Sequence, residues 1–80
     1  MADSRKKRRP ILQHRKLIGY AIRFRRTKAK LTQERLGELV ELNPKYLGEV
    51  ERGEKIISIE ALLRIARAVK TPAAEFLRDL

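Results

Sequence analysis

The sequence predicts an all-α domain of five helices, preceded by a flexible basic arm. Two observations support this fold class. Apolar residues recur three and four positions apart along most of the chain, as they do on the buried face of an amphipathic helix, and no segment has the pattern of a strand. Polar residues that commonly cap helices precede four of these stretches: Thr32, Asn43, Ser58 and Thr71.

The expected arm is residues 1–10 (MADSRKKRRP), which combine dense like charge with no apolar periodicity. Residues 11–80 form the expected domain. An apolar stripe begins near Ile11, and the first helix is predicted to cover about residues 15–28. The stripe contains Ile11, Leu12, Leu17, Ile18, Ala21 and Ile22.

The segment that follows is predicted to form two short amphipathic helices joined by a tight turn. The first covers about residues 32–40, and its apolar face consists of Leu36, Leu39 and Val40. The second covers about residues 44–51 and starts with a proline, whose missing N–H would be unpaired there in any case. A unit that displays one short helix outward is the helix-turn-helix, and its second helix suits the DNA major groove.

Two more helices complete the predicted fold. The fourth follows Ser58 and carries an apolar face that includes Leu62, Ile65 and Ala66. The fifth covers about residues 72–80 and carries three large apolar side chains: Phe76, Leu77 and Leu80. This cluster is large for an 80-residue monomer to bury, so we expect it to form a dimer surface.

Composition narrows the function classes. The chain has no cysteine and a single histidine, His14, so neither a disulfide nor a Cys-based metal site is expected. It also lacks a Gly-rich phosphate loop and any catalytic constellation, so we expect no enzyme activity, no cofactor and no metal. No apolar run approaches the ~18 residues of a membrane span, and we expect a cytoplasmic protein with no membrane partner.

Positive charge is concentrated at the start of the chain. The first thirty residues hold twelve of the twenty Lys and Arg residues but only one acidic residue, Asp3. Such a basic segment attracts polyanions such as DNA. We expect the side chains of Arg5, Lys6, Lys7, Arg8 and Arg9 to enter a minor groove or lie along phosphates, with a solvated tail as the alternative.

An ordered set of short motifs carries a family resemblance over about residues 17–77. The set is Ile18-Gly19, Ile22-Arg23, Arg26, Leu31-Thr32-Gln33, Leu36, Tyr46-Leu47, Glu51-Arg52-Gly53 and Leu62-Leu63-Arg64-Ile65-Ala66. It resembles the lambdoid-repressor and Cro-like helix-turn-helix transcriptional regulators, the Xre family. Residues 46–58 (YLGEVERGEKIIS) also resemble restriction-modification controller proteins, a branch of small homodimeric regulators.

The resemblance implies a role for each matching position. The candidates for base contact are Pro44, Lys45 and Glu49, with Tyr46 and Gly48 beside them. The candidates for phosphate contact are Gln33, Asn43, Arg52 and Lys55. Arg26 and Glu51 match a pair that forms a buried salt bridge between the first helix and the end of the third.

Some of these roles have alternatives. Lys45 is expected to donate to guanine or to a phosphate, and Glu49 to accept from a cytosine amino group or to remain solvated. Tyr46 is expected to contact a thymine methyl group or a phosphate, or to pack across the turn.

Four positions depart from the family pattern. Glu41 stands where the turn usually has Gly, at a cost of about 1 kcal/mol, and Gly37 stands where Ala is usual. Arg25 stands where many relatives have a buried Leu, and Pro44 replaces a usual polar base reader.

The implied partner is double-stranded DNA. We expect a sequence-specific transcriptional regulator that binds as a homodimer and reads an inverted repeat. The alternative is an antitoxin, or another protein-interaction module with a toxin or other protein partner, because the fold alone does not establish DNA binding.

Overall fold

The computed structural model describes the backbone of residues 4–80 and the side chains of residues 13–80. Four α-helices follow one another: α1 (Ser4–Lys28), α2 (Gln33–Val40), α3 (Pro44–Glu51) and α4 (Ile59–Ala68). A 3₁₀ helix, η1 (Ala73–Leu77), is the last element of the described part of the chain, which contains no strand. The predicted all-α class is therefore confirmed, with α2 and α3 as the two helices of the helix-turn-helix.

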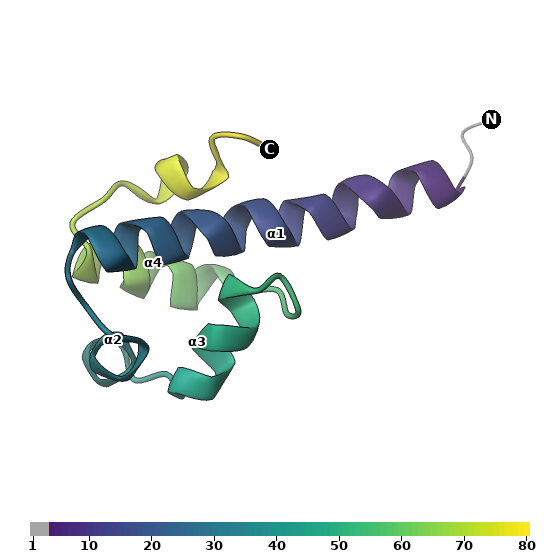
Figure 1. Cartoon of the computed structure of the whole chain (residues 1–80). Coiled ribbons are helices and arrows are strands. Elements are labelled where there is room, and N and C mark those ends of the chain that lie inside the picture. The colour runs from purple at the N-terminus through teal and green to yellow at the C-terminus, as the bar shows by residue number, and fades with distance from the viewer. Residues whose placement is uncertain (1–3) are drawn as a thin grey trace.

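The start of α1 differs from the prediction. Residues 4–10, expected to belong to a flexible arm, form the first turns of a helix that begins at Ser4; residues 1–3 lie outside the described part. Lys and Arg have favourable helix propensities, which explains how a segment without apolar periodicity can extend the helix. Figure 1 shows this N-terminal part of α1 projecting beyond the packed helices.

The core lies where α1, α2, α3 and α4 meet. Its largest fully buried side chains come from all four helices and are Ile22, Leu36, Leu47, Val50 and Ile65. Burial of such side chains contributes about 1.5–3 kcal/mol each. The predicted apolar positions are therefore mostly correct, but Leu39 is 48% exposed and does not belong to the core.

Three of the four predicted helix caps are present. Thr32 Oγ1 accepts a hydrogen bond from the Arg35 amide at 3.0 Å, Asn43 Oδ1 accepts from Lys45 at 2.8 Å, and Ser58 Oγ accepts from Ala61 at 3.1 Å. These bonds satisfy backbone donors that have no partner inside the helix. The caps fix where α2, α3 and α4 begin.

The fourth cap is absent, and the fifth predicted helix is shorter than expected. Thr71 Oγ1 donates to the Val69 carbonyl instead of accepting from a helix start, and η1 has no side-chain cap. The expected helix over residues 72–80 is thus a 3₁₀ helix of five residues. With no side-chain cap at its start, the segment forms this short 3₁₀ helix in place of the expected α-helix.

The turn between α2 and α3 has a strained residue at its first position. Glu41 has φ 59°, the left-handed conformation that favours glycine, as expected from its place in the motif. Gly37 allows a close approach, as expected from its small size. A Cβ there would lie 2.5 Å from the Leu42 carbonyl oxygen, so the residue allows the chain to pass close to α2.

Candidate nucleic-acid interface

Helix α3 is anchored on one side and exposed on the other. Leu47 and Val50 are buried in the core, whereas Lys45 is exposed and Glu49 is half-buried. Asn43, at the N-terminus of α3, is also exposed. The outward side of α3 therefore presents an amide, an ammonium and a carboxylate, the groups that hydrogen-bond to base edges and phosphates.

A buried ion pair connects α1 to the end of α3. Arg26 Nε and Nη2 donate to Glu51 Oε2 and Oε1 at 2.6 and 3.0 Å, and Arg26 Nη1 donates to the Leu31 carbonyl at 2.8 Å. The side chains are only 11% and 3% exposed. The hydrogen bond with Glu51 raises the pKa of Arg26 despite its burial. The ion pair implied by the resemblance is thus present, and it fixes α3 against α1.

Gln33 extends this network to the start of α2. Its Nε2 donates to Glu51 Oε1 at 3.1 Å, so the Glu51 carboxylate accepts bonds from both Gln33 and Arg26. An amide nitrogen has two hydrogens, which leaves a second donor on Gln33. Its half-buried position keeps Gln33 partly accessible at the N-terminus of α2, where an anion is favoured.

Gly48 does not have the role that was expected. It is buried, and a Cβ at this position would lie 3.1 Å from Arg52 Nη1 and 3.4 Å from Gln33 Oε1. The expectation of a base contact at Gly48 is therefore wrong, because neighbouring side chains cover it. Its small size instead leaves room for the side chains of Gln33 and Arg52.

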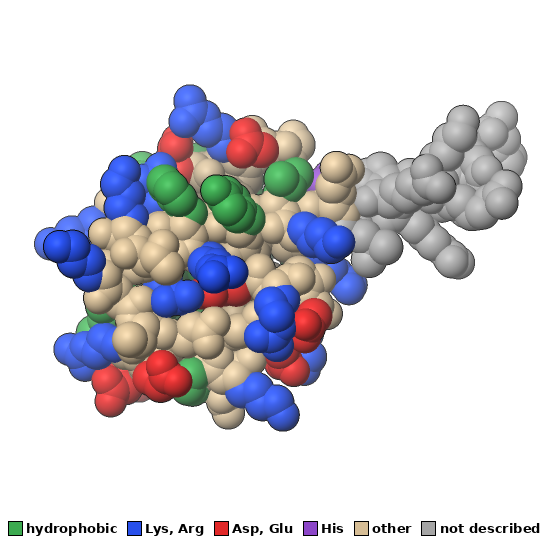
Figure 2. All heavy atoms as spheres, viewed as in Figure 1, with side chains coloured by type: hydrophobic (Ala, Val, Ile, Leu, Met, Phe, Trp, Pro, Cys, Tyr) green, Lys and Arg blue, Asp and Glu red, His purple; other side chains and the backbone are tan. Residues whose placement is uncertain are grey.

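Two basic residues that follow α3 in the chain, Arg52 and Lys55, are each paired with a carboxylate. Arg52 Nε and Nη2 donate to Glu54 Oε2 and Oε1 at 2.7 and 3.3 Å. This contact raises the pKa of Arg52 and lowers the pKa of Glu54. Lys55 Nζ lies 3.4 Å from Glu49 Oε1. Figure 2 shows acidic side chains beside several of the Lys and Arg side chains on the viewed face.

Two further candidates lie at the edges of α3. The Tyr46 hydroxyl donates to the Ile56 carbonyl at 3.3 Å, so this half-buried side chain packs across the loop, as the packing alternative predicted. Pro44 is half-buried at the first position of α3. The side chains of residues 5–9 lie outside the described part of the structure.

Comparison with known proteins identifies the family. A family model described as helix-turn-helix matches residues 22–76, from the middle of α1 to η1. The chain belongs to the helix-turn-helix family. Its motifs place it in the Xre-type branch, the branch that the sequence resembles.

The relatives of this helix-turn-helix chain are regulators by name. An uncharacterized HTH-type transcriptional regulator of Sinorhizobium medicae is 30% identical over 99% of this chain and 55% of its own length. The chain thus spans about half the length of that relative. Among solved structures, the clp gene regulator ClgR from Corynebacterium glutamicum is 33% identical, with a TM-score of 0.79 over 82% of this chain and 70% of ClgR. The restriction-modification controller protein C.AhdI from Aeromonas hydrophila is 34% identical, with a TM-score of 0.74 over 78% of this chain and 94% of C.AhdI.

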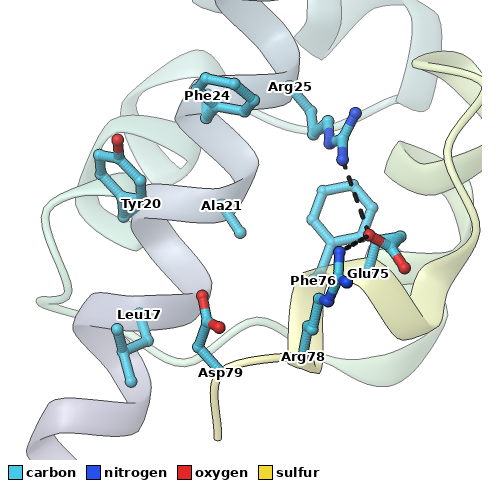
Figure 3. Close-up of a pocket in the computed structure, with 9 residues that line it drawn as sticks. All are labelled: Leu17, Tyr20, Ala21, Phe24, Arg25, Glu75, Phe76, Arg78 and Asp79. Atoms are coloured by element: carbon cyan, nitrogen blue, oxygen red, sulfur yellow. Dashed lines mark hydrogen bonds and ion pairs between the residues drawn. The ribbon is translucent and has the colours of Figure 1, made fainter.

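One expected dimer-surface residue of the helix-turn-helix chain is buried. Phe76 is 2% exposed, and Figure 3 shows its ring between η1 and α1, beside a cavity of about 180 Å³. Phe76 is therefore a core residue, and its place in a dimer surface is wrong. Leu77 and Leu80 remain 43% and 50% exposed.

Other exposed apolar side chains of the helix-turn-helix chain had no predicted role. Ile59 and Leu63, four residues apart on α4, are 78% and 52% exposed, and Ile56 in the preceding loop is 52% exposed. On α1, Tyr20 and Phe24 stack with ring centroids 6.3 Å apart. Helical spacing places Ile59 on the same side of α4 as Leu62, three residues further on, so periodicity gave no sign that Ile59 is exposed.

Neither a metal-ligand cluster nor a membrane-spanning helix is found in the described part of the helix-turn-helix chain. No three His, Cys, Asp or Glu side chains between residues 13 and 80 gather where they would hold a metal ion. Within the same residues, no helix has the length and apolar character needed to cross a membrane. His14 is partly buried.

Proposed function

We propose that this chain is a sequence-specific transcriptional regulator that inserts α3 into the major groove of double-stranded DNA. The observation that carries the proposal is the rigid display of α3. Its inner side is buried in the core, its C-terminal end is fixed to α1 by the Arg26–Glu51 pair, and Lys45 and Asn43 remain exposed. A short helix held this way fits the width of the major groove.

The proposed contacts follow from the chemistry of each exposed group. Lys45 donates to a guanine edge or to a phosphate, and Asn43, Arg52 and Lys55 donate to phosphates. Gln33 uses the amide hydrogen that Glu51 does not occupy to reach a backbone phosphate. These phosphate contacts on both sides of α3 would fix its position in the groove.

Glu49 is proposed to accept from a cytosine amino group. A carboxylate near DNA is repelled by phosphates, which argues against a free glutamate on this surface. Here Lys55 lies 3.4 Å from the Glu49 carboxylate and offsets its charge. The pair makes an acidic side chain in the groove less costly.

We propose that the regulator acts as a homodimer on an inverted repeat. One short helix reads only a few base pairs, whereas two copies related by a two-fold axis read half-sites about 34–36 Å apart. Exposed leucines at the C-terminus, Leu77 and Leu80, are the proposed dimer surface. Ile59 and Leu63 on α4 form a second exposed apolar group that is available for the same purpose.

Selection of bound sites from random duplexes tests these proposals together. The purified chain is mixed with a random duplex library at low ionic strength, and the retained sequences are compared. An inverted repeat supports both DNA reading and the dimer. A single short site supports α3 as the reading helix but contradicts the dimer, and the absence of any retained duplex contradicts DNA binding.

A further inference from the structure

The surface around α3 carries as many acids as bases. Between residues 43 and 55 the chain has three basic and three acidic residues, namely Lys45, Arg52, Lys55, Glu49, Glu51 and Glu54. Glu51 is buried and neutralised by Arg26. The two remaining carboxylates each contact a cation that we propose to bind phosphate. This arrangement is unusual for a surface that meets a polyanion, since non-specific DNA affinity comes mainly from Lys and Arg that are free to pair with phosphates.

The contact between Arg52 and Glu54 imitates a contact with phosphate. Two guanidinium nitrogens of Arg52 donate to the two carboxylate oxygens of Glu54, at 2.7 and 3.3 Å. An arginine binds a phosphate through the same fork of donors. One guanidinium edge cannot hold both acceptors, so a phosphate that uses these nitrogens must displace Glu54.

The pair is open to such an exchange. Both side chains are more than half exposed, 57% for Arg52 and 54% for Glu54, and only Gly53 lies between them in the chain. An exposed pair of this kind contributes little to stability. Among the hydrogen bonds of the described residues, the Glu54 carboxylate accepts only from Arg52, while its backbone amide donates to the Glu49 carbonyl at 2.9 Å. Its contact with Arg52 is therefore the interaction through which we expect Glu54 to affect DNA binding.

We propose that Glu54 holds Arg52 in the free protein as an internal substitute for a DNA phosphate, and thereby lowers affinity for the DNA backbone whatever the base sequence. The inference rests on the proposed function, because it assigns Glu54 a part in the same interface. Glu54 does not read bases in this proposal. It weakens the part of DNA binding that does not depend on base sequence.

A double-mutant cycle tests the proposal on a random-sequence duplex. The dissociation constants of the wild type, Glu54→Gln, Arg52→Gln and the double variant are measured by fluorescence anisotropy over a series of salt concentrations. Glu54→Gln should bind about two- to fivefold more tightly, because a surface pair no longer has to break. Its salt dependence should steepen by about one phosphate contact. The gain should disappear when Arg52 is also replaced.

A matched control separates this effect from the loss of one negative charge. Glu60 on α4 also pairs with an arginine, Arg64, at 3.6 Å, and is 86% exposed. Glu60→Gln changes the net charge equally but should leave the dissociation constant nearly unchanged. Circular dichroism checks that every variant is folded.

The possible outcomes are distinct. If the wild type binds duplexes but Glu54→Gln binds equally or more weakly, the proposal is overturned. It is also overturned if the gain persists in the Arg52→Gln background or is matched by Glu60→Gln, because net charge would then explain it. If the wild type binds no duplex even at low salt, the proposed function itself fails, and the role of Glu54 fails with it.

Discussion

Replacement of Arg26 by alanine would leave the Glu51 carboxylate buried without its main partner. The Glu51 side chain is 3% exposed and receives two of its hydrogen bonds from Arg26. The hydrogen bond with Glu51 raises the pKa of Arg26, so the guanidinium is fully charged in any ordinary assay and the substitution removes a whole charge. Loss of one partner of a buried pair costs about 3–5 kcal/mol.

The structure favours the lower end of this range. Gln33 still donates to Glu51 at 3.1 Å, which leaves the carboxylate one partner in the variant. We therefore expect a loss of about 3 kcal/mol. A chain of this length has a free energy of unfolding of about 4–12 kcal/mol, so the loss would remove a large share of its stability.

Urea unfolding followed by circular dichroism measures the effect. With a slope of about 1 kcal/mol per molar urea, the midpoint should fall by about 3 M, or the variant should be unfolded without denaturant. Arg25→Ala is the control, because Arg25 lies next in the chain and its side chain makes only weak contacts, a 3.8 Å ion pair with Glu75 and a cation–π contact with Phe24. Its midpoint should stay close to that of the wild type. A loss below about 1 kcal/mol for Arg26→Ala would refute the reasoning, since it is no more than an exposed pair contributes.

Three other predictions address the interface and the packing. Lys45→Ala should change the preference among duplex sequences by about 1–3 kcal/mol if Lys45 reads a base, as measured by competition binding. If the variant instead loses equal affinity for operator and random duplexes, Lys45 contacts a phosphate. Deletion of residues 1–9 should weaken binding to all duplexes and flatten its salt dependence in the same assay, and an unchanged salt slope would contradict a phosphate-binding role. Gly19→Ala should destabilise the fold by about 1–3 kcal/mol in urea, because its Cβ would overlap the carbonyl oxygens of Val50 and Glu51. A stability equal to that of the wild type would mean that α1 and α3 can move apart at little cost.

The features that the sequence predicts well are local or periodic. The caps at Thr32, Asn43 and Ser58 were predictable because each bond joins residues two or three positions apart. The core positions of α2 and α3 followed from helical spacing. The Arg26–Glu51 pair joins residues 25 positions apart, and only the family resemblance indicated it.

The features that were missed depend on contacts between distant parts of the chain. Nothing local shows that Phe76 packs against α1, so an apolar residue near the C-terminus was assigned to a dimer surface. Gly48 was placed beside the base-reading residues because its spacing suits that side of α3, but the side chains of Gln33 and Arg52 cover it. The helical start at Ser4 was missed because amphipathic periodicity, the signal used, is absent where a helix projects beyond the core.

The distribution of charge separates two tasks in the proposed interface. Twelve of the twenty basic residues precede Leu31, and this segment would attract DNA over a distance in a salt-dependent way. The surface around α3 is close to neutral, because carboxylates occupy Arg52 and Lys55. Such a protein would be attracted to any DNA by the charge of its first helix. On a sequence that offers no base contacts, α3 would add little to the binding free energy. The truncation of residues 1–9 and the substitution of Glu54 should therefore change binding in opposite directions, and additive effects on the binding free energy would show that the two sites act independently.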